Sequence, residues 1–405
     1  MLPRHHIAAV ALIVALISSS ATALAQTCSA MTPGRLTPLN GFVPFAAESL
    51  WNTDISGAAV DANSSNIIDY IGGAKPLHPD FGAGTFAAQS IGIPYQIVAG
   101  SQKKVNLKLG AFGDESDPGP MPIPSNALVE GYPKPGNGDR HVIVLEKDGC
   151  WIYELYHGSR LKNGSWSADS SAIWDMTIDP QRPYTWTSAD AAGLPIFAGL
   201  VRYDEVASGI INHALRFTVP VTQQAFTPPA SHWASSVTDS NAPPMGTRLR
   251  LRASFDISSF SAQNQVILTA LKRYGMILAD NGSAIFISGA PDSRWNNSDL
   301  SALKAVTGAD FDVAAMDAVY TNSDVPTGVA PAINSFIATP SSVAKGKAVT
   351  LRWTTIDALY NVISPAVGPV RSDSIVVNPK SKTTYTLYST NQFGRTNATA
   401  NVSVH

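Results

Sequence analysis

The interior histidines of the chain all lie between positions 78 and 232, close to polar runs that a packed core does not need. Histidine exchanges protons near neutral pH, carboxylates act as acids, bases or nucleophiles, and arginine binds anions. Residues of all three types in one stretch therefore predict general acid–base chemistry there. The clearest runs are Gly138-Asp-Arg-His141, Thr187-Ser-Ala-Asp190 and Asn212-His-Ala-Leu-Arg216.

A predicted β-hairpin places His141 near a carboxylate. Asp148-Gly149 is a strong signal for a two-residue turn between two apolar runs. Such a turn sets His141 opposite Tyr156. In the same register Ile143 lies opposite Glu154, so the side chain of Glu154 shares a face of the sheet with that of His141.

A three-residue loop would shift this register by one position and change the neighbours of His141. They would then be Asp139, Leu155 and His157. With either loop a titratable group lies within cross-strand reach of His141, which suits acid–base catalysis, metal binding or a structural hydrogen bond. The chain has no His-x-His or His-Glu-x-x-His spacing, so no metal ion and no other cofactor is expected.

Other polar residues complete the predicted site, each with a structural alternative. The alternation around His213 puts its side chain on the face of Leu215 and Phe217, which fits either a core histidine or the wall of a cleft. Asp190 fits a catalytic acid or the first-turn acid of a short helix capped by Ser188. The predicted catalytic residues are His141, Glu154, His213 and Asp190, and the predicted substrate-binding residues are Arg216, Tyr203, Trp186 and His232.

The start of the chain predicts export. A positive start, the apolar run of residues 7–17 and the small residues of Ala23-Leu-Ala25 are typical of a secretory signal peptide covering residues 1–25. The apolar run is too short to cross a bilayer and no other segment is long enough, so we expect a secreted protein without membrane insertion. The formal net charge of −2 leaves no basic footprint, and no nucleic-acid partner is expected.

The cysteine count predicts one disulfide. Cys28 and Cys150 are the two cysteines of the chain, and an exported protein with an even number of them favours a bridge over two free thiols. The bridge would close a loop of about 120 residues, which stabilises a fold by roughly 4–5 kcal/mol on the chain-entropy model.

A polar linker rich in proline and glycine divides the chain near its C-terminal end. It covers residues 321–331, and residues 332–405 alternate in short strand-like runs. The runs Gly346-Lys-Ala-Val-Thr-Leu-Arg-Trp353, Thr383-Thr-Tyr-Thr-Leu387 and Asn391-Gln-Phe-Gly394 resemble those of the bacterial immunoglobulin-like modules of secreted enzymes. The resemblance implies a small β-sandwich that serves as a spacer or binding unit, and we expect the rest of the chain to fold without it.

Residues 26–320 are predicted to form one main domain, a large β-sandwich or jelly-roll-like fold with a few short helices. Strand-like runs recur between turn residues, and only residues 264–273, followed by Gly275, show a clear helical pattern. Asn281-Gly282 predicts the turn of a hairpin. Residues 138–141, 187–195, 199–206, 213–218 and 274–282 resemble runs in an uncharacterised group of secreted microbial proteins, which implies one coherent domain.

Export, a spacer-like module and a β-rich body with most of the chain's 8 tryptophans predict a carbohydrate-active protein whose partner is an extracellular polysaccharide. Two reactions fit the candidate residues. One is hydrolysis by a carboxylate pair, as in a glycoside hydrolase. The other is elimination by a histidine or tyrosine base with Arg216 neutralising charge, as in a polysaccharide lyase. The alternative is a non-catalytic glycan-binding or adhesion protein.

Overall fold

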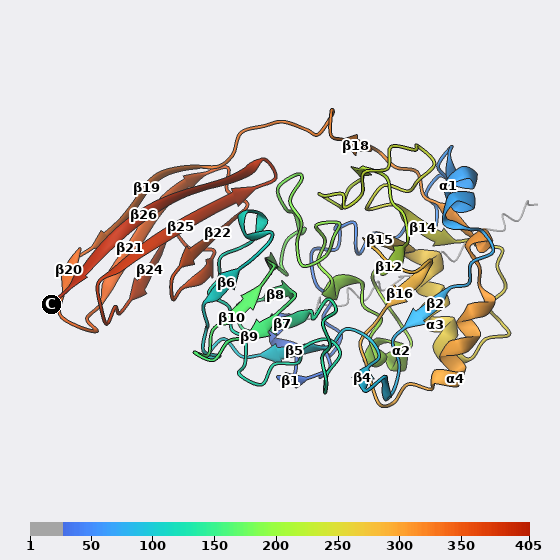
Figure 1. Cartoon of the computed structure of the whole chain (residues 1–405), viewed down its shortest axis with the longest axis horizontal. Helices are drawn as coiled ribbons and strands as arrows, with labels where there is room; N and C mark the ends of the chain where they lie inside the picture. The colour runs from blue at the N-terminus through green and yellow to red at the C-terminus, as the bar shows by residue number, and fades with distance from the viewer. Residues whose placement is uncertain (1–26) are drawn as a thin grey trace, which may run out of the picture.

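The computed structural model describes residues 27–405, so the predicted signal peptide lies outside the described residues. Two parts are visible in Figure 1: a main domain, which holds the helices and two large sheets, and an elongated sandwich, which carries the C-terminus. The prediction of a mainly β fold with few short helices is confirmed.

A five-stranded sheet is covered on both faces, which explains the unbroken apolar run Val142-Ile-Val-Leu145. Ile143 and Leu145 pack into the large core of the main domain, whereas Val142 and Val144 pack into a second core on the other face. In order across the sheet the strands are β1 (Gly34–Arg35), β5 (Tyr95–Val98), β7 (Val142–Glu146), β8 (Trp151–Tyr156) and β11 (Ser170–Asp175).

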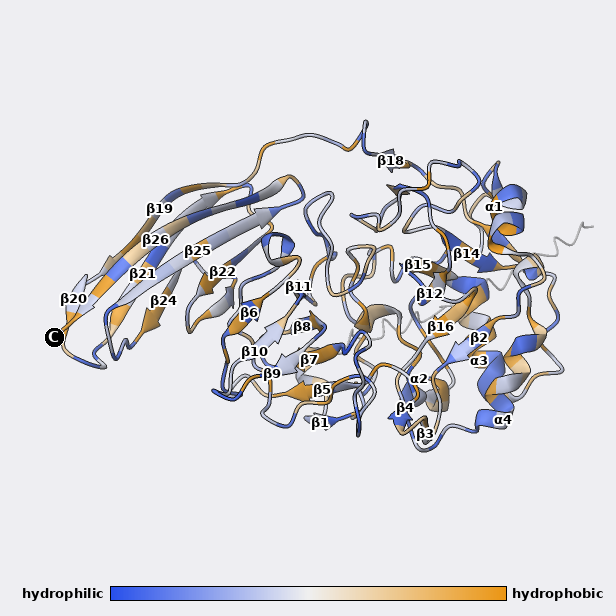
Figure 2. Ribbon diagram, in the orientation of Figure 1, coloured by the Kyte–Doolittle hydropathy of each residue, from blue (hydrophilic) through white to orange (hydrophobic). Residues whose placement is uncertain are grey.

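A mixed six-stranded sheet contributes to the same large core. In spatial order its strands are β17 (Phe311–Val313), β14 (Arg248–Leu251), β15 (Met276–Asn281), β12 (Leu215–Val219), β16 (Phe286–Ser288) and β2 (His78–Asp80). Strand β12 runs parallel to β15 and antiparallel to β16. The predicted hairpin around Asn281-Gly282 is therefore wrong, because β12 separates its two strands. Figure 2 shows that the short helix α4 (Asn297–Leu300) is mainly hydrophilic.

Short helices and small sheets surround these two layers. Helix α3 (Ala262–Arg273) confirms the predicted helix: the Ser261 hydroxyl accepts the N–H of Asn264 at its start, and Gly275 follows it at φ +68°. The other helices are α1 (Ser64–Ile71) and α2 (Tyr203–Ser208), and the 3₁₀ turns are η1 (Cys28–Ala30), η2 (Gly113–Glu115), η3 (Phe197–Gly199), η4 (Ser301–Ala305) and η5 (Gly308–Asp310). The small sheets are β6 (Leu107–Leu109), β10 (Trp166–Ala168) and β9 (Ser159–Arg160); β13 (Ala225–Phe226) and β18 (Tyr320–Thr321); and β3 (Thr85–Phe86) and β4 (Gln89–Ser90).

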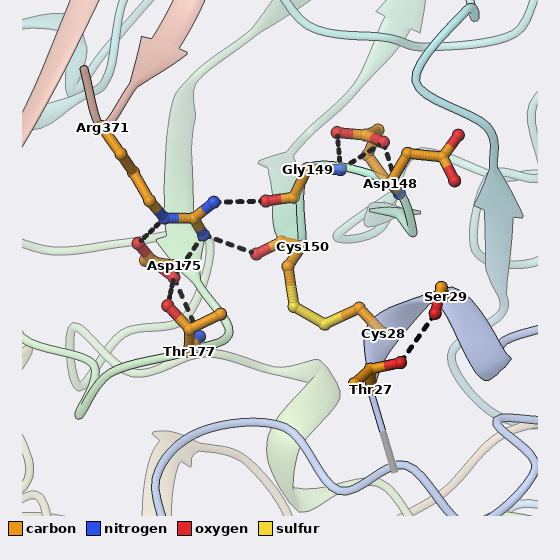
Figure 3. Close-up of a disulfide and its surroundings, with 10 residues drawn as sticks. Thr27, Cys28, Ser29, Asp148, Gly149, Cys150, Asp175, Thr177 and Arg371 are labelled. Atoms are coloured by element: carbon orange, nitrogen blue, oxygen red, sulfur yellow. Dashed lines mark hydrogen bonds and ion pairs between the residues drawn. A yellow bond between two sulfur atoms is a disulfide. The ribbon is translucent and has the colours of Figure 1, made fainter.

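A disulfide joins Cys28 to Cys150, as predicted, with Cα atoms 5.5 Å apart (Figure 3). Cys150 lies in the loop between β7 and β8. Arg371 of the C-terminal module binds the same loop by donating to the carbonyl oxygen of Gly149 at 2.6 Å, and it pairs with the carboxylate of Asp175. The loop is thus fastened both to the N-terminal segment and to the C-terminal module.

The C-terminal module is a sandwich of two sheets, as expected from the immunoglobulin-like pattern. The three-stranded sheet has the order β19 (Ala332–Thr339), β21 (Val349–Ile356) and β24 (Ser374–Val377). The five-stranded sheet has the order β20 (Ser342–Val343), β26 (Gly394–Val404), β25 (Thr383–Asn391), β22 (Tyr360–Ser364) and β23 (Gly368–Val370). Trp353, Tyr385 and Leu387 lie in its core. The sequence has no cysteine in this module, so no disulfide joins its two sheets.

The module and the main domain share a hydrophobic core. Tyr360 and Val362 of β22 pack into the same cluster as Tyr153 and Trp166 of the main domain. At this interface the Tyr360 hydroxyl donates to Asp117 Oδ1 at 3.0 Å, and Asp117 is also paired with the buried Arg182 at 2.8 Å. We expected the main domain to fold without the module. This buried contact between the two parts argues against that expectation.

Candidate active site

An open cavity of about 440 Å³ is lined by strands of the six-stranded sheet and by the loop that leads into β7. Its aromatic side chains are Phe86, which is 80% exposed, and Phe286. Its titratable side chains are Asp80 of β2, Arg216 of β12 and Asp280 of β15 on the sheet, and Glu130, Asp139, Arg140 and His141 on the loop.

His141 lies in the wall of this cavity with both ring nitrogens engaged. Nδ1 is 2.7 Å from Glu130 Oε2, and Nε2 donates to the carbonyl oxygen of Ala189 at 3.1 Å. Burial of the ring opposes its charge, but the Glu130 carboxylate outweighs burial and raises the pKa of His141 to about 9. The carboxylate partner of the predicted histidine is therefore Glu130, which comes from the loop and not from the facing strand.

Arg216 reaches the cavity from β12 with its charge already paired. Its Nε and Nη2 donate to the two carboxylate oxygens of Asp190 at 2.8 and 2.7 Å, and Nη1 donates to the hydroxyl of Ser288 at 2.6 Å. Asp280 Oδ2 is 3.4 Å from Nη2. Since Asp190 neutralises the guanidinium in a buried pair, Arg216 has little net charge left for a ligand.

Two aspartates of the cavity hold protons more tightly than usual. Burial, reinforced by the negative charge of Asp190, raises the pKa of Asp280 to about 7, against the attraction of Arg216. Burial also raises the pKa of Asp80, and the charge of Glu130 acts in the same direction. Asp280 is therefore a carboxyl group that can deliver a proton near neutral pH.

A second cavity of about 410 Å³ meets the first. Asp139, Asp280 and Asn281 line both cavities, so carboxyl groups lie at the junction. The walls of the second cavity include Tyr156 and His232, and the Nδ1 of His232 donates to the carbonyl oxygen of Ala191 at 2.7 Å. Burial lowers the pKa of His232. The two cavities together form a groove, which we call the acidic groove.

Half of the predicted site residues lie at the acidic groove. His141 and Arg216 line the first cavity, His232 lines the second, and Asp190 lines the second while pairing with Arg216. The short helix proposed to begin near Asp190 does not form. The segment is a turn, in which the Ser188 hydroxyl accepts the N–H of Asp190 and donates to Leu194 O.

Glu154 lies opposite the predicted residue of β7, but the contacts of its side chain are structural. Ile143 pairs with Glu154, as the two-residue turn required. Its carboxylate is fully buried and accepts from the indole N–H of Trp174 at 3.0 Å and from the backbone N–H groups of Ile196 and Phe197 at 3.1 and 2.9 Å. Sharing a sheet face with His141 thus does not bring the two together: Glu154 serves the neighbouring backbone and does not line the acidic groove.

His213 belongs to another cluster. Its Nδ1 donates to Ala214 O at 2.8 Å, so its Nε2 accepts from Arg202 at 2.9 Å. Glu205 completes the cluster by pairing with Arg202 at 2.7 Å. The prediction that His213 joins His141 in one site is wrong, because the buried Arg202 and the half-buried Glu205 contact the His213 ring just before β12 begins.

Tyr203 and Trp186 also lie away from the acidic groove. Tyr203 begins α2, packs edge-on against Trp295 with ring centroids 4.9 Å apart, and is covered by Arg294. Trp186 lies between the guanidinium groups of Arg182 and Arg395, 5.7 and 4.7 Å from their carbon atoms. Arg395 belongs to the C-terminal module, so Trp186 is an interface residue.

Sequence reasoning did not assign Glu130, Asp280 or Asp80 to the site. Asp280 stands directly before the Asn281-Gly282 pair that predicted a turn, and Glu130 lies in a loop without a regular pattern. Asp139 was considered only as an alternative neighbour of His141. The short spacing between Asp139 and His141 was the one local signal in the sequence that placed two residues of the groove together.

No model of a known protein family matches the chain, and neither does any curated protein sequence. Similar solved structures include a chimeric titin Z1Z2 protein carrying a decorin peptide, 19% identical over 18% of this chain and 94% of that one, with a TM-score of 0.15. A structure on Dscam isoform specificity is 11% identical over 68% of this chain and 57% of that one, also with a TM-score of 0.15. The described residues contain no helix long and apolar enough to span a membrane.

Proposed function

We propose that the chain is a secreted glycoside hydrolase that cleaves an uncharged or amino-bearing polysaccharide in the acidic groove. Asp280 gives its proton to the glycosidic oxygen as the bond to the sugar carbon breaks. Asp139 takes a proton from the water that attacks that carbon. One observation carries the proposal: Asp280, with a pKa of about 7, lies at the junction of two cavities that also share Asp139.

Glycoside hydrolysis needs two carboxyl groups with different tasks, one protonated and one ionised. Asp280 retains a proton to an unusually high pH because it is largely removed from water, although half-buried, and lies near the charge of Asp190. Asp139 is exposed, so water reaches it. A polysaccharide chain lying along both cavities would pass both groups at the junction, which favours cleavage within the chain.

The charges of the groove favour hydrolysis over elimination. Lyases act on uronates, whose carboxylates need positive partners, but the groove carries Asp80, Glu130, Asp139 and Asp280. Of its positive groups, Arg216 is paired with Asp190, His141 is paired with Glu130, and Arg140 donates to the backbone carbonyls of Gly136 and Gly158. The bases expected for a lyase are also poorly placed. His141 Nε2 is used by Ala189 O, and burial raises the pKa of Tyr156.

Aromatic surface for a sugar ring is available beside these carboxyl groups. Phe86 is 80% exposed in the wall of the first cavity, and Phe286 lines the same cavity with its ring stacked on His78 at 3.9 Å. Aromatic faces pack against the apolar faces of sugars, whereas an exposed phenylalanine otherwise leaves apolar surface in water.

The test incubates the mature protein with neutral glucans and xylans, chitosan, and polyuronates. We expect new reducing ends from a neutral or amino-bearing polymer, a fall in viscosity that precedes extensive release of small sugars, and no absorbance from unsaturated uronates. Asp280→Asn should lower kcat at least about 100-fold, a typical contribution of general acid catalysis.

Asp256→Asn is the matched control, because Asp256 is an exposed aspartate outside the groove, and it should leave the rate unchanged. Unsaturated uronate products would overturn the hydrolase in favour of a lyase. Binding to a polymer without any cleavage would favour the non-catalytic glycan-binding protein.

A further inference from the structure

We infer that Glu130, Asp139 and His141 form a binding site for a divalent transition-metal ion, with Zn²⁺ as the ion that the ligand set fits best. Their ligand atoms all lie within 4.8 Å of one another. One imidazole nitrogen and two carboxylate oxygens suit Zn²⁺, and three protein ligands leave a position open for water.

The second nitrogen of His141 has the partner that a metal-binding histidine usually has. Its Nε2–H donates to the carbonyl oxygen of Ala189 at 3.1 Å, which fixes the tautomer and leaves Nδ1 as the ligand atom. Nδ1 contacts Glu130 Oε2 directly at 2.7 Å, and a bound ion would replace this contact by a bond to each of the two atoms. The ring is only 2% exposed, so its orientation is held by packing as well.

The loop that carries the three groups is closed on itself. The backbone N–H of Glu130 donates to His141 O at 2.9 Å, and the N–H of His141 donates back to Glu130 Oε2 at 3.3 Å. Between the other two ligands, Arg140 adopts a left-handed conformation with φ +51°. Its guanidinium holds that conformation by donating to Gly136 O at 2.9 Å and Gly158 O at 3.2 Å. Glu130 and His141 are therefore positioned before any ion binds, and the backbone between His141 and Asp139 is fixed at Arg140.

The surroundings favour a cation. Asp80 and Asp280 line the same cavity as the proposed ligands, Arg216 is already paired with Asp190, and the guanidinium of Arg140 is turned to the carbonyl oxygens of Gly136 and Gly158. A divalent ion would offset the repulsion among these carboxylates. Without an ion, His141 and Glu130 form a simple ion pair. A metal site and a simple ion pair predict different results when Zn²⁺ is added.

This site goes beyond the proposed function and shares Asp139 with it: an ion held by Asp139 would take that carboxylate away from the attacking water. Binding is therefore measured by itself, without any glycan. Tag-free mature protein, stripped with a chelator, is titrated calorimetrically with Zn²⁺, Mn²⁺, Ca²⁺ and Mg²⁺ in turn. We expect one Zn²⁺ per chain, weaker binding of Ca²⁺ and Mg²⁺, and a rise in the melting temperature with Zn²⁺ concentration.

Asp139→Asn should weaken Zn²⁺ binding by at least about 100-fold, and His141→Ala should abolish it, since outer-shell changes alone cost roughly 10–100-fold in affinity. Asp139 is exposed, so its variant should keep the circular dichroism spectrum of the parent. His157→Ala is the matched control: His157 pairs with Asp169 at the same 2.7 Å but has no second carboxylate, and its loss should leave binding unchanged.

Two results would overturn the site. One is the absence of saturable Zn²⁺ binding at millimolar concentration in the parent protein. The other is Zn²⁺ binding that survives both Asp139→Asn and His141→Ala. Hydrolysis is tested separately, by Asp280→Asn and the products that metal-free protein releases.

Discussion

Asp190 holds Arg216 through two hydrogen bonds, from Nε to Oδ2 at 2.8 Å and from Nη2 to Oδ1 at 2.7 Å. Both side chains are buried, so the pair belongs to the interior of the main domain although it borders the acidic groove. Asp190, which was predicted to be catalytic, and Arg216, which was predicted to bind substrate, therefore interact mainly with each other. Their mutual neutralisation leaves the other carboxyl groups to determine the charge of the groove.

Asp190→Asn should therefore destabilise the protein by about 3–5 kcal/mol, because the buried guanidinium of Arg216 loses its bidentate counter-charge and keeps only the longer contact with Asp280 at 3.4 Å. Chemical denaturation followed by circular dichroism measures the loss. The comparison is Asp54→Asn, which breaks the exposed pair of Asp54 with Arg273 and should change the midpoint little. Equal effects of the two substitutions would show that burial of the Asp190 pair does not matter.

The pH dependence of hydrolysis should carry the signature of Asp280. A general acid must be protonated, so kcat/KM should fall as the pH rises through about 7, the pKa to which burial raises Asp280. A pH–rate profile on the best polymer measures this limb. In Asp280→Asn any residual rate should lack it, and a residual rate that still falls near pH 7 would assign the acid to another group.

Glu154→Gln should lower stability by roughly 1–3 kcal/mol at pH 5, where the raised pKa keeps Glu154 protonated: both oxygens of its carboxyl group accept from N–H groups, and the NH₂ that replaces one of them cannot accept. Thermal and urea denaturation at pH 5 measure the effect. An unchanged midpoint would contradict the structural role.

The pH dependence of stability should also reflect Glu154. Burial raises its pKa from 4.5 to about 7 in the folded chain, so its contribution to stability is fully present below pH 4.5 and is lost as the pH rises to about 7. The parent should lose stability over this window, and the loss should be smaller in the Glu154→Gln variant, as unfolding midpoints at a series of pH values would show.

Removal of residues 332–405 should lower the melting temperature of the main domain, because it exposes the cluster that Tyr360 and Val362 complete and leaves Asp117 without the Tyr360 hydroxyl. Tyr360→Ala in the full chain should reproduce part of the loss. Scanning calorimetry compares them with the substitution of Val376, an apolar residue of the module that is 57% exposed, by alanine. A truncated protein that melts like the parent would establish that the two parts are independent.

Cys28→Ser should cost about 4–5 kcal/mol on the chain-entropy model, since the bridge to Cys150 spans a sequence separation of 122 residues. Urea denaturation measures the change, and the intact mass after alkylation without reductant reports whether the parent carries free thiols. Two alkylated thiols in the parent would disprove the bridge.

Local patterns in the sequence determined several features of this protein. The Asp148-Gly149 turn defined the register that pairs Ile143 with Glu154, and Ser261 and Gly275 bounded α3. The even number of cysteines, together with the predicted export, favoured the bridge between Cys28 and Cys150 that the structure contains. The turn and the helix ends depend on residues close in sequence, and two cysteines allow only one bridge within the chain. These features could therefore be predicted without knowing the packed fold.

The candidate site was decided by the tertiary structure. The Asn281-Gly282 signal predicted a hairpin turn, but β12 supplied the backbone partner for both flanking strands, and any strand of suitable length can satisfy those hydrogen bonds. That insertion brought Arg216 within 3.4 Å of Asp280. Glu130 reached His141, and Asp190 reached Arg216, from segments that periodicity does not describe. Which charged side chains pair in the interior depends on which segments become neighbours when the core packs. The local spacing of residues along the chain does not specify these neighbours.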